Sequence, residues 1–392
     1  MRDGWTYKKL GEVAVKISDG SHNPPKGVDY SPYPMLSSKN VFFDYYNYDD
    51  PRYLSKEAFE EENKRTDISD GDVLLTIVGT VGRTCCVKSP FIPFTLQRSV
   101  AVLKPKKESI ASRFLMYALH SLSELWNNEA KGVAQKGVYL KQLASIPIPI
   151  PPLSEQQRIV SELDLLSSII EKKKAQLKEY DQLAHSIFFD MFGDPVSNEK
   201  GWEVKKLGEL ALVKTGPFGS MLHKQDYISN GTPLVNPIHM KDFHIIADMD
   251  FTISDEKAEE LDKYILQKGD VIFARRGDIG RCAVVTEKEN GYLCGTGSLF
   301  VRFVVEVVST FIMYIIRSSS FTNELVSNAK GATMLNLNSS IVEDLRLPLP
   351  PLPLQQSFTS KIKAIERQKA LIQQSITEVE TLFNSRMDYY FN

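Results

Sequence analysis

The strongest constraint on the fold is an internal duplication in which each half of the chain ends in a long helical pattern. Residues 146–192 open with a proline-rich segment and continue as a helix-like repeat of apolar positions. Residues 345–391 repeat this design 199 positions later, and Gln156 falls on Gln355 without a gap. A chain with this organisation has to place two long helices beside whatever precedes each of them.

Apolar side chains in both helical patterns alternate in steps of three and four residues, which is typical of a coiled-coil seam. The seam positions are Leu163, Leu166, Ile170, Leu177, Tyr180, Ala184, Ile187 and Met191 in the first copy, and Phe358, Ile362, Ile365, Ile372, Ile376, Val379 and Phe383 in the second. A single copy would equally suit a dimerisation segment. Two copies in one register favour an intramolecular pair.

The segments before the two helices are also repeats of each other. WTYKKLGEVA, which begins at Trp5, recurs as WEVKKLGELA from Trp202, and GDVLLTIVGTVGR at 71–83 recurs as GDVIFARRGDIGR at 269–281. Glycine-containing turns at 18–25 and 214–220 suit the positive φ that glycine tolerates. Each half therefore reads as a globular domain of mixed helices and strands, an α+β organisation with pseudo-two-fold symmetry.

We expect four parts in the chain. They are a first globular domain at 1–145, a first proline-rich segment with its helix at 146–193, a second globular domain at 194–344, and a second proline-rich segment with its helix at 345–392.

Composition predicts a soluble cytoplasmic protein. Hydrophobic residues make up 42% of the 392 and charged residues 24%, which are ordinary globular values. The N-terminus lacks an apolar signal core, and the most apolar run contains Arg302 and Glu306, so no membrane span is expected. Four cysteines without zinc-ligand spacing indicate reduced thiols in the core.

A net charge of −2 hides an uneven distribution. Acidic blocks at 44–72 and 242–262 occupy corresponding places in the two halves, and outside its block the first half is strongly basic. A localised basic face matters more than net charge for binding phosphates.

Motifs for catalysis are weak or missing. Asn23-Pro24-Pro25 is similar to the Asn-Pro-Pro-aromatic motif of DNA adenine methyltransferases, but Lys26 stands where the aromatic residue belongs. No Gly-x-x-x-x-Gly-Lys-Ser/Thr phosphate loop occurs. Residues 194–200 resemble a nuclease carboxylate–lysine run but follow a helix end, as a polar linker would. The sequence indicates a non-catalytic chain.

The order of these parts resembles the specificity subunit of type I restriction-modification systems. The residues that carry the resemblance are the phrases PIPIPPLSEQQ and PLPPLPLQQ with the helix after each, the junction SIFFDMFGDP, and the repeated openings and glycine turns. It implies a DNA-sequence reader with two target-recognition domains joined by an antiparallel helix pair, each domain reading half of a bipartite, asymmetric site.

The resemblance also implies partners and cofactors. Double-stranded DNA, two copies of a modification (methyltransferase) subunit and a restriction (endonuclease and translocase) subunit are the expected partners, and no membrane is expected. S-adenosylmethionine, ATP and Mg would bind to the partner subunits, and this chain would hold no cofactor or metal.

Base edges are read by polar and charged side chains on loops held by a rigid scaffold. The candidates are Ser21, His22, Lys39, Asn40, Arg83, Gln97 and Arg98 in the first half, and Ser220, His223, Lys224, Asn236, His239, Arg275, Arg276 and Arg281 in the second. Contact with phosphate alone, or with nothing, is the competing interpretation for each. Arg83 and Arg281 follow the same glycine turn, which favours a shared backbone contact over base reading.

A second hypothesis remains open on the residues alone. A pseudosymmetric coiled-coil scaffold that binds only proteins would show the same repeats without any preference for a DNA sequence.

Overall fold

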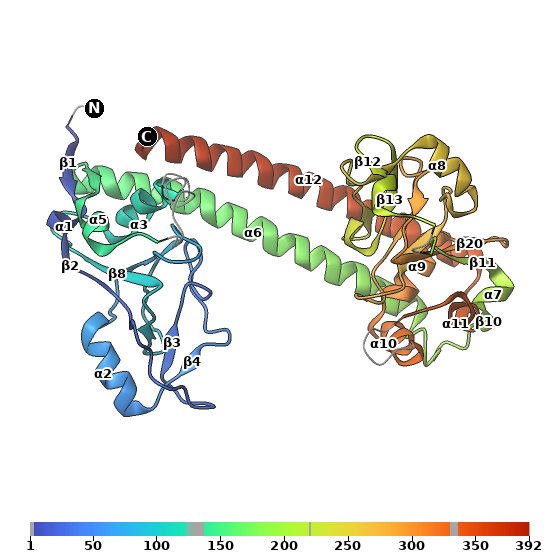
Figure 1. Ribbon diagram of the computed structural model, residues 1–392, viewed down its shortest axis with the longest axis horizontal. Helices are drawn as coiled ribbons and strands as arrows, with labels where there is room; N and C mark the ends of the chain where they lie inside the picture. The colour runs from blue at the N-terminus through green and yellow to red at the C-terminus, as the bar shows by residue number, and fades with distance from the viewer. Residues whose placement is uncertain (1–3, 124–125, 127–136, 219–220, 330–335, 392) are drawn as a thin grey trace. The chain divides into compact units, whose positions relative to one another are not determined.

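The computed structural model describes residues 4–123, 126, 137–218, 221–329 and 336–391. The chain forms two compact units, one of Met1–Lys174 with Gln374–Asn392 and one of Ala175–Gln373. Each unit holds one globular domain together with one end of each long helix (Figure 1).

The core of the first domain is a four-stranded antiparallel sheet in the order β2-β8-β5-β6. Its strands are β2 (Ala14–Asp19), β5 (Val73–Thr76), β6 (Thr84–Cys86) and β8 (Val100–Pro105). All four residues of β5 are buried, as expected for a short apolar run between turn residues. Helix α3 (Ser112–Ser121) packs against β5 and β6 and buries Phe114 and Tyr117.

A smaller sheet, β4-β3-β7, lies beside the first and carries helix α2. Its strands are β3 (Pro34–Leu36), β4 (Arg52–Tyr53) and β7 (Thr95–Leu96), and the helix is α2 (Lys56–Thr66). Ser55 caps this helix by accepting a hydrogen bond from the Ala58 amide at 3.2 Å.

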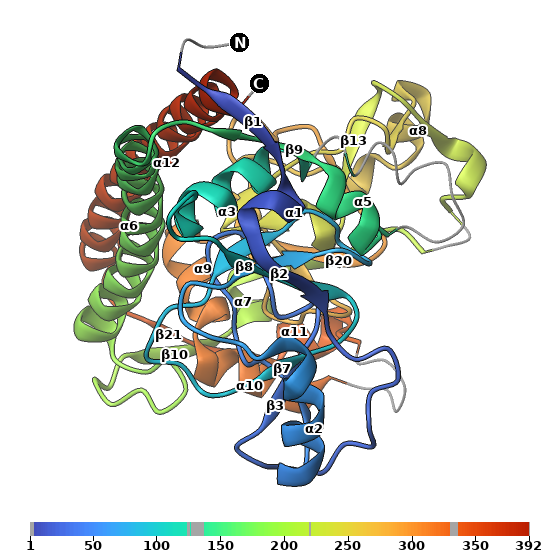
Figure 2. The same ribbon diagram turned by 90° about the vertical axis from the view of Figure 1, so that its left-hand side faces the viewer.

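The two ends of the domain are held together by a two-stranded antiparallel ribbon. Strand β1 (Thr6–Lys9) pairs with the proline-rich β9 (Pro147–Ile150), which lies beside it in Figure 2. Prolines are tolerated here because a two-stranded ribbon leaves one side of each strand without a hydrogen-bonded neighbour. The short helices α1 (Leu10–Val13) and α5 (Leu140–Ser145) pack against each other next to the ribbon.

The second domain repeats the sheet as β11-β20-β17-β18 and the ribbon as β10-β21. Its strands are β10 (Glu203–Lys206), β11 (Ala211–Thr215), β12 (Tyr227–Ile228), β13 (Thr232–Val235), β14 (Met240–Lys241), β15 (His244–Ile245), β16 (Thr252–Ile253), β17 (Val271–Ala274), β18 (Cys282–Val284), β19 (Leu293–Cys294), β20 (Ser298–Phe303) and β21 (Arg346–Leu349). Its helices are α7 (Leu207–Leu210), α8 (Asp255–Glu260), α9 (Ser309–Arg317), α10 (Ser319–Asn328) and α11 (Ser339–Glu343), with 3-10 turns η2 (Lys224–Asp226), η3 (Pro237–His239) and η4 (Asp262–Tyr264).

Helices α9 and α10 are separated by a break at Ser318. This residue has an extended backbone, with φ −60° and ψ 143°, and its hydroxyl accepts from the Phe321 amide as the cap of α10. The apolar period continues across the break, which is why the sequence alone did not reveal it.

Each long helix is tied to its domain by one buried glutamine. Helix α6 (Leu153–Phe192) and helix α12 (Leu352–Phe391) each have 40 residues, roughly 60 Å at ~1.5 Å per residue. Gln156 accepts a hydrogen bond from the Ala111 amide at 2.8 Å and donates to the Ser109 carbonyl at 3.0 Å. Gln355 accepts from the Val308 amide at 3.0 Å and donates to the Pro350 carbonyl at 2.8 Å.

Within each unit, α6 and α12 run antiparallel. In the first unit Glu162 bonds Arg386 and accepts from the Tyr390 hydroxyl at 2.6 Å, and Lys174 lies 3.3 Å from Glu380. Because contacts at increasing positions in α6 fall at decreasing positions in α12, the helices point in opposite directions. The expected α+β fold with an antiparallel helix pair is confirmed.

In the second unit the helix seam merges with the core of the globular domain. Phe188 and Phe192 pack with tilted or edge-on rings against Phe311 of α9 and Phe358 of α12. The heptad pattern did not predict these two phenylalanines, because a third partner widens the buried face beyond a two-helix seam. Lys369, where the pattern breaks, pairs with Asp181 at 2.7 Å.

Replacing Phe188 by alanine tests this packing against a neighbour on the same helix. Phe188 is 1% exposed and Phe189 is 36% exposed. We expect Phe188→Ala to lower the free energy of unfolding by about 3–5 kcal/mol, and Phe189→Ala to lower it far less. Urea denaturation followed by circular dichroism measures both; equal losses would contradict the described packing.

Candidate nucleic-acid interface

Five loops of the first domain meet at one end of its main sheet, where β2 and β5 end and β8 begins. We call residues 20–22, 37–40, 77–83, 97–99 and 137–139 the first loop cluster. The hydrogen bonds that join its loops are Gly20 N to Val100 O at 3.2 Å, Ser38 N to Ser99 Oγ at 3.0 Å, Ile77 N to Ser99 O at 2.9 Å and Val138 N to Ile77 O at 2.9 Å. Loops that carry candidate residues far apart in the sequence therefore lie next to one another.

The second domain repeats three of these four bonds, a set that we call the circuit, and replaces the bond between Ser38 and Ser99 by one from the Gly297 amide to the Asn236 side chain. Its loop cluster comprises residues 216–218, 236–239, 275–281, 295–297 and 336–338. The bonds are Gly216 N to Ser298 O at 3.0 Å, Gly297 N to Asn236 Oδ1 at 3.1 Å, Arg275 N to Gly297 O at 3.1 Å and Leu337 N to Arg275 O at 2.9 Å. The two domains thus share this backbone frame of hydrogen-bonded loops, whereas the side chains that the loops carry differ.

A glycine is required where each circuit begins, but for a different reason from the one expected. Neither Gly20 nor Gly216 is among the positive-φ residues. A Cβ on Gly20 would lie 2.0 Å from the Leu96 carbonyl oxygen, and one on Gly216 would lie 2.0 Å from that of Gly295. Close approach of two backbones, rather than a left-handed conformation, excludes every side chain here.

Basic side chains of the first cluster and of its neighbours border a hollow of about 710 Å³. His22 contacts Asp19 at 2.7 Å with its side chain 54% exposed, and Arg98 on the neighbouring loop is exposed. Arg65, at the end of α2, also pairs with Asp19. Sequence reasoning missed Arg65 because it lies in a block dominated by acids; Lys141, also on the hollow, was missed as well.

The remaining candidates of the first cluster are less accessible. Ser21 is 6% exposed and Asn40 is fully buried, while Gln97 is half-buried. Lys39 is exposed and pairs with Asp50 at 2.6 Å. Ser21 belongs to the frame through its backbone, since its carbonyl accepts from the Arg98 amide at 2.9 Å.

Asn40 and His239 make the same local contact in the two domains. The Asn40 Oδ1 accepts a hydrogen bond from the Ser37 amide at 3.1 Å, and the His239 Nδ1 accepts one from the Asn236 amide at 3.2 Å. Two different side chains thus close equivalent turns. His239 is only half-buried, so its ring also borders the surface.

Arg83 and Arg281 both reach back to a neighbouring loop. The Arg83 guanidinium donates to the Val41 carbonyl at 3.5 Å, and that of Arg281 donates to the Pro237 carbonyl at 3.2 Å. Their shared partner is backbone, as a common structural role requires.

Arg275 places a buried positive charge inside the second cluster. It is 5% exposed, and its Nε donates to the Asn336 Oδ1 at 3.1 Å. Burial, and then the charge of the neighbouring Arg276, lower the pKa of the Arg275 guanidinium below its usual value. Within the described part of the chain no carboxylate forms an ion pair with Arg275. Arg276 is exposed, so this loop presents a net positive charge.

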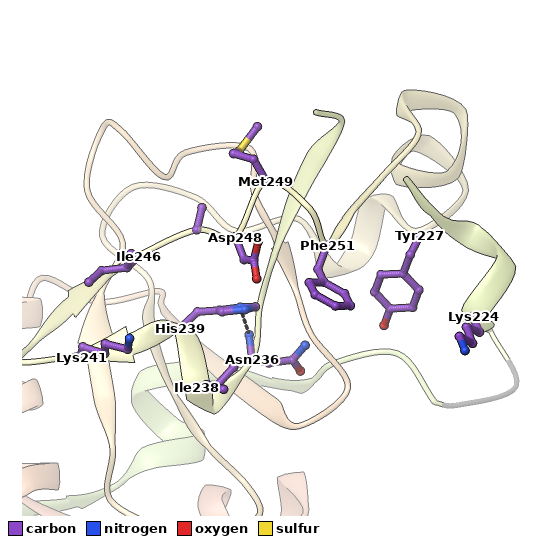
Figure 3. Close-up of a pocket in the computed structure, with 11 residues that line it drawn as sticks. Lys224, Tyr227, Asn236, Ile238, His239, Lys241, Ile246, Asp248, Met249 and Phe251 are labelled. Carbon is purple, nitrogen blue, oxygen red and sulfur yellow. Dashed lines mark hydrogen bonds between the residues drawn. The ribbon is translucent and has the colours of Figure 1, made fainter. Parts of the chain in front are cut away.

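A second hollow, of about 840 Å³, adjoins the second cluster (Figure 3). Asn236 and His239 border it together with Lys224, Lys241 and Asp248, and the apolar side chains that line it are Tyr227, Ile238, Ile246, Ala247, Met249 and Phe251. His223 is exposed beside it, and Ser220 lies outside the described residues. None of the apolar residues was singled out from the sequence, because they lie on strands and turns between the polar motifs.

The described residues contain no group of three or more histidine, cysteine or acidic side chains placed to hold a metal ion. All four cysteines are buried free thiols, and burial raises the pKa of Cys86 and of Cys282 to about 12. Among the helices of the described chain, none has the length and apolarity that a bilayer crossing demands.

Comparison with known proteins decides the family. The sequence profile described as "Type I restriction modification DNA specificity domain" matches residues 2–179 and again residues 199–381. The chain belongs to this family. It is a DNA-sequence-recognition protein rather than the coiled-coil scaffold that the repeats alone also allowed.

Relatives of the same family span nearly the whole chain. The specificity subunit of the type I restriction enzyme MjaIX of Methanocaldococcus jannaschii is 24% identical, over 94% of this chain and 89% of that protein. The EcoKI specificity subunit of Escherichia coli K12 is 21% identical, over 93% and 82%. The crystal structure of the type I S subunit from M. genitalium superposes with a TM-score of 0.54 at 14% identity, covering 98% of this chain and 95% of that one. The fold is therefore that of the S subunits.

The glycine turn before Arg281 offers a test of the shared frame. Gly277 and Gly280 both have positive φ, at +73° and +96°, but only Gly280 has a close neighbour, with Thr322 Oγ1 2.7 Å from an added Cβ. Both alanine variants should lose about 1–2 kcal/mol from the left-handed backbone, and Gly280→Ala should lose about 1–3 kcal/mol more from overpacking. Unfolding in urea compares them, and equal destabilisation would refute the close approach.

Proposed function

We propose that each globular domain reads one half of a bipartite, asymmetric DNA site and directs modification and restriction subunits to it. The supporting observation is that one hydrogen-bonded circuit carries different side chains in the two domains. Where the first circuit presents Gln97 and Arg98, the second presents Gly295 and Thr296. A DNA site with two unlike halves needs two recognition domains that share a fold and differ in their surface side chains.

The candidate residues divide into readers and frame residues under this proposal. Exposed cations such as Arg98, Lys224 and Arg276 contact phosphates or base edges. Arg83 and Arg281 hold the loops, and Ser21 and Asn40 act through buried contacts. The domains then span 1–145 and 194–344, with the proline-rich segments and helices between and after them.

The chain itself carries no catalytic step under this proposal. Partner subunits supply methyl transfer and cleavage, and with them the sites for S-adenosylmethionine, ATP and Mg. The polar side chains of the two loop clusters form hydrogen-bonding and phosphate-binding surfaces, which suits recognition.

Replacing the first domain tests the division of labour. With residues 1–145 exchanged for those of a family member of different specificity, one half of the methylated sequence should change and the other should stay. Methylation mapping of cells that contain the exchanged chain and the modification subunit gives the answer. A change in both halves would contradict the two-reader proposal. Higher salt should weaken binding to every sequence alike, because phosphate contacts release counterions whatever the bases are.

Two copies of the modification subunit are proposed, one for each repeat. Leu183 of α6 and Leu382 of α12 occupy equivalent positions 199 residues apart and are 46% and 49% exposed. Exposed leucines repeated in this way offer two similar apolar contacts, as a partner present twice would require. Leu371 is 59% exposed, but its equivalent is Lys172, so it serves as a control.

Replacing either leucine by glutamate should prevent the binding of one modification subunit. Native mass measurement of the co-purified complex should find two copies with the wild-type chain, one with either Leu183→Glu or Leu382→Glu, and none with both changes. Leu371→Glu should keep two. A wild-type complex with a single copy at saturating partner would rule out the proposed stoichiometry.

A further inference from the structure

The hollow beside the second loop cluster presents two side chains whose hydrogen-bonding direction is fixed by the backbone. Asn236 and His239 both border it, and Figure 3 shows the side-chain amide of Asn236 projecting to the side on which Phe251 and Tyr227 lie. An amide side chain can ordinarily present either its oxygen or its NH₂ to a base. Here contacts behind the hollow remove that choice.

The orientation of Asn236 follows from Gly297. The Gly297 amide donates to Asn236 Oδ1 at 3.1 Å, so the oxygen faces the neighbouring loop. A Cβ on Gly295 would lie 2.3 Å from the same Oδ1, so backbone and side chain are in close contact there. The Nδ2 group, at the other end of the planar amide, is left to donate.

The tautomer of His239 follows from Asn236. Because the backbone N–H of Asn236 donates to His239 Nδ1 at 3.2 Å, the neutral ring carries its hydrogen on Nε2. Both residues are therefore donors toward the hollow.

Two converging donors select between the two chemical classes of base. In the major groove guanine presents N7 and O6 as acceptors and thymine presents O4 and a methyl group, whereas adenine and cytosine present NH₂ donors. The apolar side chains around the donors, with Ile238 67% and Phe251 55% exposed, suit the methyl group and repel water.

We propose that Asn236 and His239 determine specificity in the second domain by selecting a keto base, guanine or thymine, on one strand of its half-site. This inference rests on the proposed function, because it requires that the second domain reads DNA. The equivalent position of the first domain does not offer this donor, because Asn40, the equivalent of His239, is fully buried.

Asn236→Asp converts the donor into an acceptor without changing its shape. One carboxylate oxygen can still accept from Gly297, while the other replaces the NH₂ group and now suits the NH₂ of cytosine or adenine. The base pair required at one position of the second half-site should therefore reverse its strands, for example from G·C to C·G. Binding to the original site should weaken by roughly ten- to hundredfold relative to the reversed site.

Two further variants separate the possible causes. Ile238→Asp places the same charge on the same hollow without altering a donor, so it should weaken binding and leave the sequence unchanged. His239→Asn should keep the turn closed, as Asn40 does in the first domain, and remove the imidazole donor. It should relax the requirement at one position of the same half.

Methylation maps of cells that express each full-length variant with the modification subunit are the measurement. A reversal confined to one position of one half supports the proposal, and a motif unchanged by both Asn236→Asp and His239→Asn overturns it. If Asn236→Asp fails to fold, His239→Asn decides, since an unchanged motif refutes the proposal and a relaxed one supports it. A wild-type chain that confers no sequence preference would contradict the proposed function itself.

Discussion

The buried glutamine at the start of each long helix is the contact on which the architecture depends. Gln156 and Gln355 are 0% and 3% exposed. The side chain of Gln156 bonds Ala111, just before α3, and Pro151, just before α6. The side chain of Gln355 bonds Val308, just before α9, and Pro350, just before α12. A buried amide left without these partners would cost about 1–3 kcal/mol. In each copy these bonds therefore fix how the domain is attached to its long helix.

From these two contacts the remaining packing follows. In the second unit the helix directed by Gln355 presents Phe358 to Phe188, and in the first unit the helix directed by Gln156 presents Asp164 to Arg113, which also bonds Asp44. Asp44 lies just beyond the loop at 37–40, in a left-handed conformation with φ 67°. Ion pairs through Arg113 thus connect the segment just after the 37–40 loop to the helix that supports its domain.

Much of the fold could be predicted from the sequence because repeated local patterns of residues indicate it. Heptad spacing indicated both helices, and the repeated segments before them indicated two similar domains of mixed helices and strands. The break at Ser318 was not indicated because the apolar period continues across it, and the burial of Phe188 was not indicated because its partners Phe311 and Phe358 are distant in the chain. For the candidate site, residue type suggested the polar loops, but only the register of β2, β8 and β5 brings those loops together. The roles of Asn40 and His239 depend on an amide three residues away, which composition does not reveal.

The ribbon that pairs Lys9 with Pro147, and its counterpart that pairs Lys206 with Arg346, has an evolutionary consequence. Each domain begins and ends at one two-stranded ribbon, so loops away from the helices can change in length without moving the point at which the domain joins them, provided that the contacts of Gln156 and Gln355 are kept. Loops inside can lengthen, shrink or be acquired whole by recombination without altering the register of the scaffold. Exchange of a whole domain would change the sequence that is read, and the ribbon strands are the natural crossover points for such an exchange.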